Sequence, residues 1–306
     1  MPLSRALYRP VVAAGSRRVL STSARHAQQG RAKRPPFDEV QRSRPDFEAL
    51  DYVATKTPDP AWKTGTGANG HPSGNGSQRR KEMLRADELG DAENYKLIVG
   101  GIIPRPIALV SSHDATGKRN LAPFSYFGAV GHKPPMVMIS FNSAKAGQKD
   151  SAANILETKR FSVNIISESF VEAANYTSID APHDVSEWDL SGLTPSPSRY
   201  WPEEGDAPPT VGESAYSLEC ELHDSMSLLD DDGKETGKII VGRIRAYILN
   251  EGIIQPDGSL SPGDILPIAR GGGITYLRST HGLELPRPRW SREGESETVK
   301  SLLAKR

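Results

Sequence analysis

Cysteine is almost absent from this chain: the 306 residues include one, Cys220, so no disulfide can form within a single chain. It stands at an apolar position of a predicted strand, where a lone cysteine usually acts as a small buried hydrophobe; a redox or nucleophilic role is the alternative. No two of the seven histidines have metal-ligand spacing. We therefore expect no metal site.

Long apolar runs are also missing. No stretch approaches the length of a membrane-spanning segment, so we expect no membrane insertion. The formal net charge is zero, and we expect no nucleic-acid partner. With 36% hydrophobic and 25% charged residues, the chain can build one substantial core.

Acidic residues are missing from the beginning of the chain. Asp38 is the first, and eight basic residues precede it: Arg5, Arg9, Arg17, Arg18, Arg25, Arg31, Lys33 and Arg34. An arginine-rich, serine-bearing, acid-free segment without a long apolar centre is typical of a mitochondrial transit peptide. We predict such a peptide over residues 1–30 and a location in the mitochondrial matrix. The alternatives are a disordered basic arm and a cytoplasmic location.

A proline- and glycine-rich stretch follows over residues 31–81, and its composition predicts a disordered linker. Residues 65–70 match the G-x-G-x-x-G dinucleotide fingerprint. The fingerprint requires a preceding strand and a following helix, and both flanks here are polar. We therefore predict no dinucleotide site there.

The rest of the chain reads mostly as strands. Apolar or alternating runs predict strands over 107–112, 120–127, 136–141, 161–166, 217–222 and 238–249, with a hairpin loop at 228–237. Helical spacing is restricted to short segments at 94–97, 149–156, 170–177 and 299–303. We predict a mainly β fold, a β-barrel with a few helices, over residues 82–290, followed by a C-terminal tail over 291–306.

Two neighbouring strands carry the polar residues of a candidate site. The apolar run 107–110 ends on Ser111 and Ser112, and a turn over 113–119 returns the chain antiparallel. This hairpin is expected to bring Asn120 and Ser125 near the paired serines.

A helix start lies further along the chain. At Lys149-Asp150-Ser151 a helical pattern begins, and the free amides of a helix N-terminus, with a lysine and a hydroxyl, form a site for an anion. A terminal phosphate would suit it. Hydroxyls, amides and one cation together suit flavin mononucleotide, FMN.

The runs 104–112, 120–127 and 149–155 resemble those of the flavin reductase-like proteins, which have the FMN-binding split barrel, and particularly their flavoredoxin-like branch. The similarity continues through 158–166, 185–198 and 217–222 and ends near 269–278. Two positions depart from the family pattern. Ser151 replaces a threonine, and residues 270–273 read Arg-Gly-Gly-Gly instead of Arg-Leu-Gly-Gly.

The resemblance implies a role for each residue. Ser111, Ser112 and the backbone of 121–125 would line the flavin ring and ribityl chain, and Asn120 would bond a polar edge. Lys149 and Ser151 would hold the phosphate, with Asp150 capping the helix. The expected cofactor-binding set is Arg105, Ser111, Ser112, Asn120, Leu121, Ala122, Pro123, Phe124, Ser125, Lys149, Asp150, Ser151 and Asn154.

Three positions keep two interpretations each. Arg105 either fixes the start of a strand or faces a phosphate or the pyrimidine edge of the flavin. Asn154 either supports the phosphate site or caps a neighbouring loop. The acidic run 180–189 is a solvated loop anchored by Trp188, or else it holds His183 as an acid or base near the flavin.

The function that the resemblance implies is an NAD(P)H-dependent FMN reductase, with hydride transfer to flavin N5 and no catalytic side chain. Two alternatives stay open: an electron carrier of the flavoredoxin type that takes electrons from a protein donor, and a non-catalytic FMN-binding scaffold. Family members are homodimers, so we expect a homodimer here.

Overall fold

The computed structural model describes residues 36–67, 83–142, 149–182, 184–202 and 207–305. The chain divides into two units, Met1–Glu48 with Arg80–Asp91 and Ala49–Arg79 with Ala92–Arg306. The predicted transit peptide and much of the glycine-rich segment lie outside the described residues.

The described part of the first unit contains two short helices, α2 (Phe37–Arg42) and η1 (Ala86–Glu88). Within the stretch predicted to be a linker, the structure therefore places α2 and also a strand of the second unit, β1 (Val53–Thr55).

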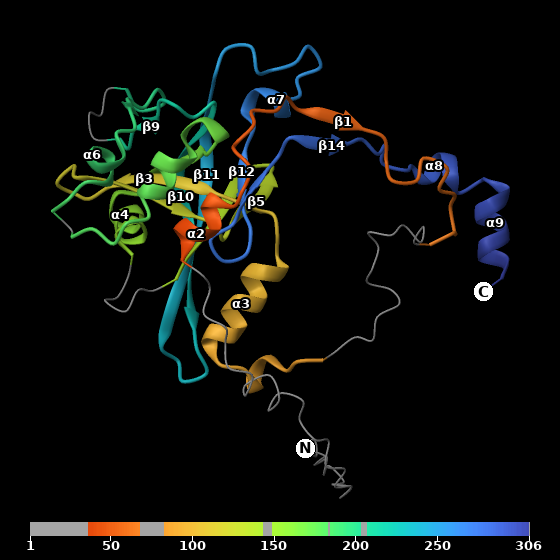
Figure 1. Ribbon diagram of the computed structural model, residues 1–306, viewed down its shortest axis with the longest axis horizontal. Coiled ribbons are helices and arrows are strands. Elements are labelled where there is room, and N and C mark those ends of the chain that lie inside the picture. Colours follow the sequence, from red (N-terminus) through yellow and green to blue (C-terminus); the bar gives the residue numbers. More distant parts are fainter. Residues whose placement is uncertain (1–35, 68–82, 143–148, 183, 203–206, 306) are drawn as a thin grey trace, which may run out of the picture. The chain divides into compact units, whose positions relative to one another are not determined.

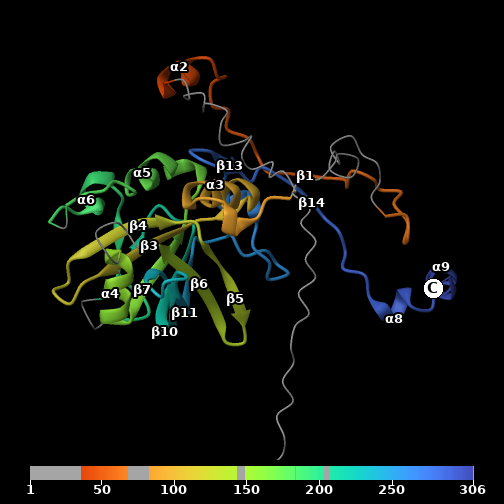
Figure 2. The same cartoon turned by 90° about the horizontal axis from the view of Figure 1, so that it is seen from below.

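The second unit is built around a seven-stranded sheet with the order β4-β3-β7-β10-β11-β6-β5, all pairs antiparallel (Figures 1 and 2). Figure 2 shows β10 and β11 between the pair β3 and β4 and the pair β5 and β6. The strands are β3 (Ala108–His113), β4 (Arg119–Phe124), β5 (Phe127–His132), β6 (Pro135–Asn142), β7 (Arg160–Ile165), β10 (Tyr216–Leu229) and β11 (Glu235–Leu249).

The β10–β11 hairpin is longer than the sequence predicted. Its turn spans only residues 230–234, where the Asp230 carboxylate accepts the backbone N–H groups of Asp232 (3.1 Å) and Lys234 (2.9 Å). Gly233 takes the left-handed conformation at φ 78°. Because Asp230 closes the turn, the flanking residues that were predicted as loop pair as strand.

Three smaller sheets flank the large one. The three-stranded sheet β13-β12-β2 joins β2 (Arg105–Pro106), β12 (Ile268–Arg270) and β13 (Tyr276–Arg278). Strand β8 (Pro195–Ser196) pairs with β9 (Thr210–Val211), and β1 pairs in parallel with β14 (His281–Leu283).

The helices of this unit are short. They are α3 (Asp91–Gly101), α4 (Asp150–Thr158), η2 (Glu168–Phe170), α5 (Val171–Tyr176), α6 (Glu187–Ser191), α7 (Pro262–Ile265), α8 (Trp290–Glu293) and α9 (Glu297–Ala304). Helix α4 packs against β3 and β4. The helices predicted from the spacing near residues 170–177 and 299–303 are confirmed by α5 and α9.

Helix α3 extends beyond the short helix expected at 94–97, through Gly100 and Gly101. The guanidinium of Arg105 explains its length. The side chain donates to the carbonyl oxygens of Val99 (2.6 Å) and Ile102 (2.7 Å), which satisfies groups that the end of a helix leaves unpaired.

The core consists of two clusters of buried side chains. The first includes Ile139, Phe141, Phe161 and Cys220 and lies between the sheet and α4. The second joins Leu109 and Leu121 to residues of η2, α5, α6 and β12, among them Phe170, Trp188 and Ile268. Alternating side chains of β3 enter different clusters, because successive residues of a strand point to opposite faces.

The prediction of a mainly β fold with a few helices is confirmed. Over the described residues, β4 and β5 are the edge strands of the large sheet and do not pair with each other. None of the helices that the structure describes has the length and apolar character needed to cross a bilayer.

Candidate functional site

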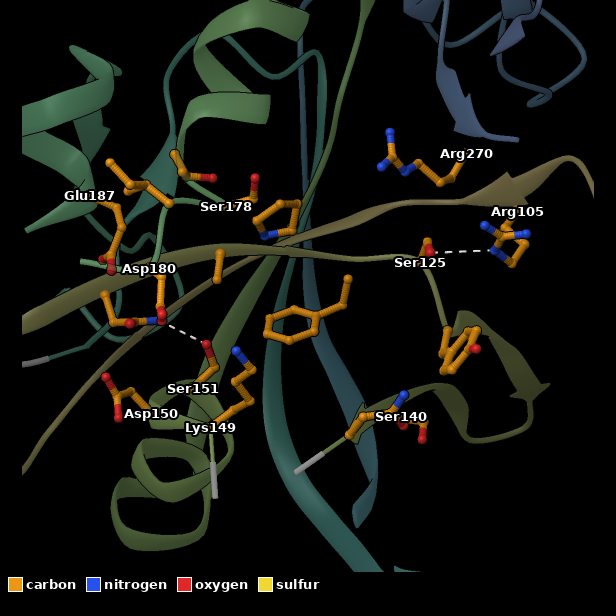
Figure 3. A pocket seen from close by; sticks show the side chains of 18 of the residues that line it. Arg105, Ser125, Ser140, Lys149, Asp150, Ser151, Ser178, Asp180, Glu187 and Arg270 are labelled. Atoms are coloured by element: carbon orange, nitrogen blue, oxygen red, sulfur yellow. Dashed lines mark hydrogen bonds between the residues drawn. The ribbon is translucent and has the colours of Figure 1, made fainter. Parts of the chain in front are cut away.

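A cleft of about 430 Å³ opens beside β4, between the first turn of α4 and strand β12 (Figure 3). Its volume lies within the range of about 300–1,000 Å³ that is common for small-molecule sites. Its lining residues are Tyr95, Val99, Arg105, Asn120, Ala122, Pro123, Phe124, Ser125, Tyr126, Ser140, Asn142, Lys149, Asp150, Ser151, Thr177, Ser178, Ile179, Asp180, Ala181, Glu187, Arg270 and Gly273.

One end of the cleft is the N-terminus of α4. Lys149 is the N-cap residue, and no side chain caps the helix. The N–H groups of Ala152 and Ala153 donate to the Lys149 carbonyl, whereas those of Asp150 and Ser151 have no acceptor among the described residues. Two amides and an ammonium group are therefore available to an anion at this end.

The prediction that Asp150 caps α4 is wrong. Asp150 is the first residue of the helix, one position after the N-cap, and a cap side chain must accept from amides further into the first turn. Its exposed carboxylate instead lines the cleft beside Lys149 (Figure 3).

A hydrogen bond ties this end of the cleft to the sheet. The side-chain amide of Asn120 on β4 donates to Ser151 Oγ over 2.8 Å. Because the hydroxyl oxygen of Ser151 accepts here, its own proton is available to a second acceptor. Asn120 thereby orients a donor toward the anion site.

Arg105 lines the opposite end of the cleft (Figure 3) and is only 6% exposed. Besides the two α3 carbonyls, it donates to the carbonyl of Gly271 (2.9 Å) and to Ser125 Oγ (3.4 Å). These four bonds leave one of the five guanidinium N–H groups for any other partner. Arg105 thus fixes the local structure, as one of its two predicted interpretations has it. Only one of its N–H groups is left for a ligand.

The middle of the cleft is formed by β4 and the residues after it. Ala122, Pro123 and Phe124 contribute mostly apolar surface, and Ser125 and Tyr126 follow. Burial raises the pKa of the Tyr126 phenol; the nearby Tyr95 adds to this shift and the positive charge of Arg105 opposes it. The phenol therefore stays protonated at neutral pH.

A second wall of the cleft comes from residues 177–181 and Glu187. None of them was predicted as a site residue, and the run 180–189 was placed near the flavin in only one of its two interpretations. Ser178, Ile179 and Asp180 follow α5, and Glu187 begins α6. The Glu187 carboxylate accepts the backbone N–H of Leu121 over 3.3 Å, which holds α6 against β4. Trp188 is 5% exposed, so it anchors this segment as predicted. His183 lies outside the described residues.

Arg270, Gly273 and the α3 residues Tyr95 and Val99 also line the cleft and were not predicted as site residues. For Arg270 and Gly273 the sequence held one signal, the departure from the family pattern at residues 270–273. Only the pairing of β12 with β2 brings it to Arg105.

Nine of the thirteen predicted site residues line this one cleft: Arg105, Asn120, Ala122, Pro123, Phe124, Ser125, Lys149, Asp150 and Ser151. Ser111, Ser112, Leu121 and Asn154 do not. Ser112 is fully buried and accepts from the Asn154 side chain over 3.2 Å, so this pair holds α4 on β3. Ser111 and Leu121 are fully buried at paired positions of β3 and β4. Ser125 also lies away from the paired serines, because it follows the far end of β4.

The cleft can bind an elongated ligand that has an anionic group at one end and a flat, largely apolar part along β4. The described residues contain no group of three or more histidine, cysteine, aspartate or glutamate side chains arranged for a metal ion.

Comparisons with known proteins identify the family of this chain. The family model described as "Flavin reductase like domain" matches residues 100–260. An uncharacterized protein, BH2278, of Halalkalibacterium halodurans is 33% identical over 213 residues, which cover 69% of this chain and 99% of that protein.

Two solved structures are similar. Nitrilotriacetate monooxygenase component B from Bacillus cereus has a TM-score of 0.63 and 31% identity over 68% of this chain and all of its own. A putative flavin reductase with a split barrel domain from Shewanella frigidimarina has a TM-score of 0.55 and 22% identity, covering 66% of this chain and 94% of its own. The second likeness concerns the fold alone.

The relatives correct the predicted location in the mitochondrial matrix. They include proteins of Halalkalibacterium halodurans, Bacillus subtilis, Aquifex aeolicus and Deinococcus radiodurans, which are bacteria and have no mitochondria. An arginine-rich, acid-free beginning is a compositional signal that other segments share, and the mitochondrial location predicted from it is wrong.

Eighteen of the 22 residues that line the cleft lie within the matched residues 100–260, and BH2278 is similar over 99% of its own length. The chain therefore belongs to the flavin reductase-like family.

Proposed function

We propose that this protein binds FMN in the cleft beside β4 and catalyses its reduction by NAD(P)H. The observation that carries the proposal is the pairing, in one cleft, of an uncapped helix N-terminus beside Lys149 with the largely apolar edge of β4. A flavin mononucleotide has a matching phosphate and a matching flat ring.

The phosphate would be held at α4. Its acceptor oxygens suit the ammonium of Lys149, the free amides of Asp150 and Ser151 and the hydroxyl proton that Asn120 leaves available on Ser151. The carboxylate of Asp150 also lines the cleft beside Lys149, but it is exposed, so water and salt would screen its repulsion of the phosphate.

The ring would lie along residues 122–125. Ser125 accepts from Arg105, so its hydroxyl proton can be donated to a ring oxygen or nitrogen. With the remaining N–H of Arg105 and the protonated phenol of Tyr126, this end of the cleft offers donors to negative charge on the ring. Bound there, FMN would supply the hydride acceptor at N5. The protein holds, orients and polarises the ring, and no side-chain base is required.

We also infer that the seven-stranded sheet belongs to a split barrel and that the protein is a homodimer. The likeness to the Shewanella frigidimarina protein supports the first. The second is supported by α3 and the residues after it, which expose five large apolar side chains: Tyr95 (55%), Leu97 (51%), Ile98 (45%), Ile102 (62%) and Ile103 (47%). Light scattering during size exclusion gives the mass that checks this inference.

An absorbance spectrum of the purified full-length protein, before and after addition of FMN, tests the cofactor. Anaerobic addition of NADH or NADPH then tests the chemistry. We expect a bound yellow flavin that bleaches rapidly with one or both nucleotides. A flavin that stays oxidised until a protein donor is added would favour the electron carrier, and a flavin that no donor reduces would favour the scaffold. A protein that binds no FMN would refute the proposal.

A further inference from the structure

Arg270 occupies the end of the cleft opposite Lys149. It lies on β12, where its backbone is paired with Arg105 on β2 and with Tyr276 on β13. Figure 3 shows Arg270, Arg105 and Ser125 on one side of the cleft and Lys149, Ser151 and Asp150 on the other. The cleft thus has a cationic side chain at each end.

Arg270 has no acceptor for its guanidinium among the described residues. Among these residues, its one partner is the ring of Tyr276, whose centroid lies 4.4 Å from the guanidinium carbon. Other arginines with little exposure are satisfied by oxygen atoms. Arg105 donates to three carbonyls and Ser125, and Arg278 forms a two-bond ion pair with Glu168.

Neighbouring residues also hold Arg270 in a fixed position. The Tyr276 hydroxyl donates to the side chain of Asn175 over 2.7 Å, which fixes the ring below the guanidinium. Arg105 fixes the next residue, Gly271, through its carbonyl. A Cβ on Gly272 would lie 3.3 Å from the Gly100 Cα, so the small residue lets this loop approach α3 closely. The guanidinium is therefore preorganised.

A partly buried cation without a counter-ion has lost some hydration without regaining it from the protein. A guanidinium has a planar set of donors that matches a carboxylate or phosphate in a two-bond geometry. FMN carries one phosphate, and the α4 end already provides for one anion. The Arg270 end is therefore available for a second anionic group.

We propose that Arg270 forms an anion subsite, which binds a carboxylate or phosphate group of the second substrate, the molecule that exchanges electrons with the flavin. The proposal rests on FMN occupying the α4 end. The second substrate is accordingly an anion: a nucleotide held through a phosphate or an organic acid held through its carboxylate.

The test uses the full-length FMN-loaded protein and the variant Arg270→Gln. Binding of NADP⁺, NAD⁺ and benzoate is measured by isothermal titration calorimetry, and FMN affinity is measured separately by fluorescence quenching. Because a charge-assisted bond is lost, we expect Arg270→Gln to weaken at least one of these anions by roughly ten- to a hundred-fold while FMN affinity stays within about two-fold. Arg270→Lys keeps the positive charge but loses the planar pair of donors, so its anion affinity should lie between those of the wild type and Arg270→Gln.

The probes also identify the source of the anion. If Arg270→Gln loses affinity for NADP⁺ and NAD⁺ alone, the natural ligand group is a nucleotide phosphate. If it loses affinity for benzoate alone, the group is the carboxylate of an organic acid. Arg243→Gln is the matched control, since Arg243 is exposed on β11 and lies outside the lining of the cleft; it should bind every probe like the wild type.

Three results would overturn the subsite. They are a wild-type protein that binds none of the probes, an Arg270→Gln variant that binds all of them normally, and a variant that loses FMN affinity, which would make Arg270 part of the flavin site. Failure of the wild type to bind FMN in the separate measurement refutes the proposed function instead. The anion titrations are then repeated without FMN, and equal binding by wild type and Arg270→Gln would overturn the subsite as well.

Discussion

Asn120 on β4 donates its side-chain amide proton to Ser151 Oγ at the start of α4, over 2.8 Å and across 31 positions of the sequence. This bond joins the β4 wall of the cleft to the end formed by the first turn of α4. A ligand that spans both parts therefore meets two elements whose separation is fixed before it binds.

Charge reversal at Lys149 should weaken FMN binding. Lys149→Glu replaces the ammonium beside the free amides of α4 with a carboxylate, which removes one charge-assisted bond and adds repulsion. We expect a loss of about 1–3 kcal/mol in binding free energy, measured by titration of flavin fluorescence. Lys234→Glu, in the exposed β10–β11 turn, is the control. If both variants bind FMN with equal affinity, the phosphate does not bind at the start of α4.

Replacement of Arg105 should reduce stability. Arg105→Met keeps much of the side-chain length but leaves the carbonyls of Val99, Ile102 and Gly271 without this donor. The free energy of unfolding should fall by about 2–4 kcal/mol, measured by urea denaturation. Arg243→Met, at an exposed position, should change it by less than about 0.5 kcal/mol. A stable Arg105→Met protein would show that these bonds contribute little.

A methyl group at Gly242 should overpack the core. A Cβ there would lie 2.2 Å from Cζ of Phe161, which is 1% exposed and cannot move freely. Gly242→Ala should cost about 1–3 kcal/mol of unfolding free energy, and adding Phe161→Leu should recover part of the loss. Gly128→Ala is matched, because no atom lies within 4 Å of its added Cβ. Strictly additive effects of the first two changes would contradict the contact.

The thiol of Cys220 should be unreactive in the folded protein. Cys220 is fully buried; burial raises the pKa of its thiol well above the ordinary value, and the neighbouring charge of Glu219 raises it further. A raised pKa means less thiolate at a given pH, so an aromatic disulfide reagent at about pH 8 should not label the native chain. One thiol per chain should react in guanidinium chloride. Rapid native labelling would show that β10 opens.

The polar runs along β3, β4 and α4 were predictable because each is local. The turn over 113–119 returns the chain by its own chemistry, and helical spacing fixes the start of α4. Period-two alternation places Ser111 and Ser112 on opposite faces of the sheet, so the two could not share a ligand. Both serines are fully buried, and Ser112 is covered by α4 through Asn154; the sequence does not encode that packing locally.

By itself, the amino-acid sequence determined the mainly β class, the hairpins and the position of the helix start at Lys149, because hydrophobic alternation and turn residues act over a few neighbours. Only the tertiary structure decided that Arg105 bonds Gly271, 166 positions away, and that Arg270 therefore faces the cleft. It also brought residues 177–181 and Glu187 to the second wall. Such contacts depend on which strands pair and which helices cover them, and pairing between distant segments follows from burial of the whole core and not from any local pattern.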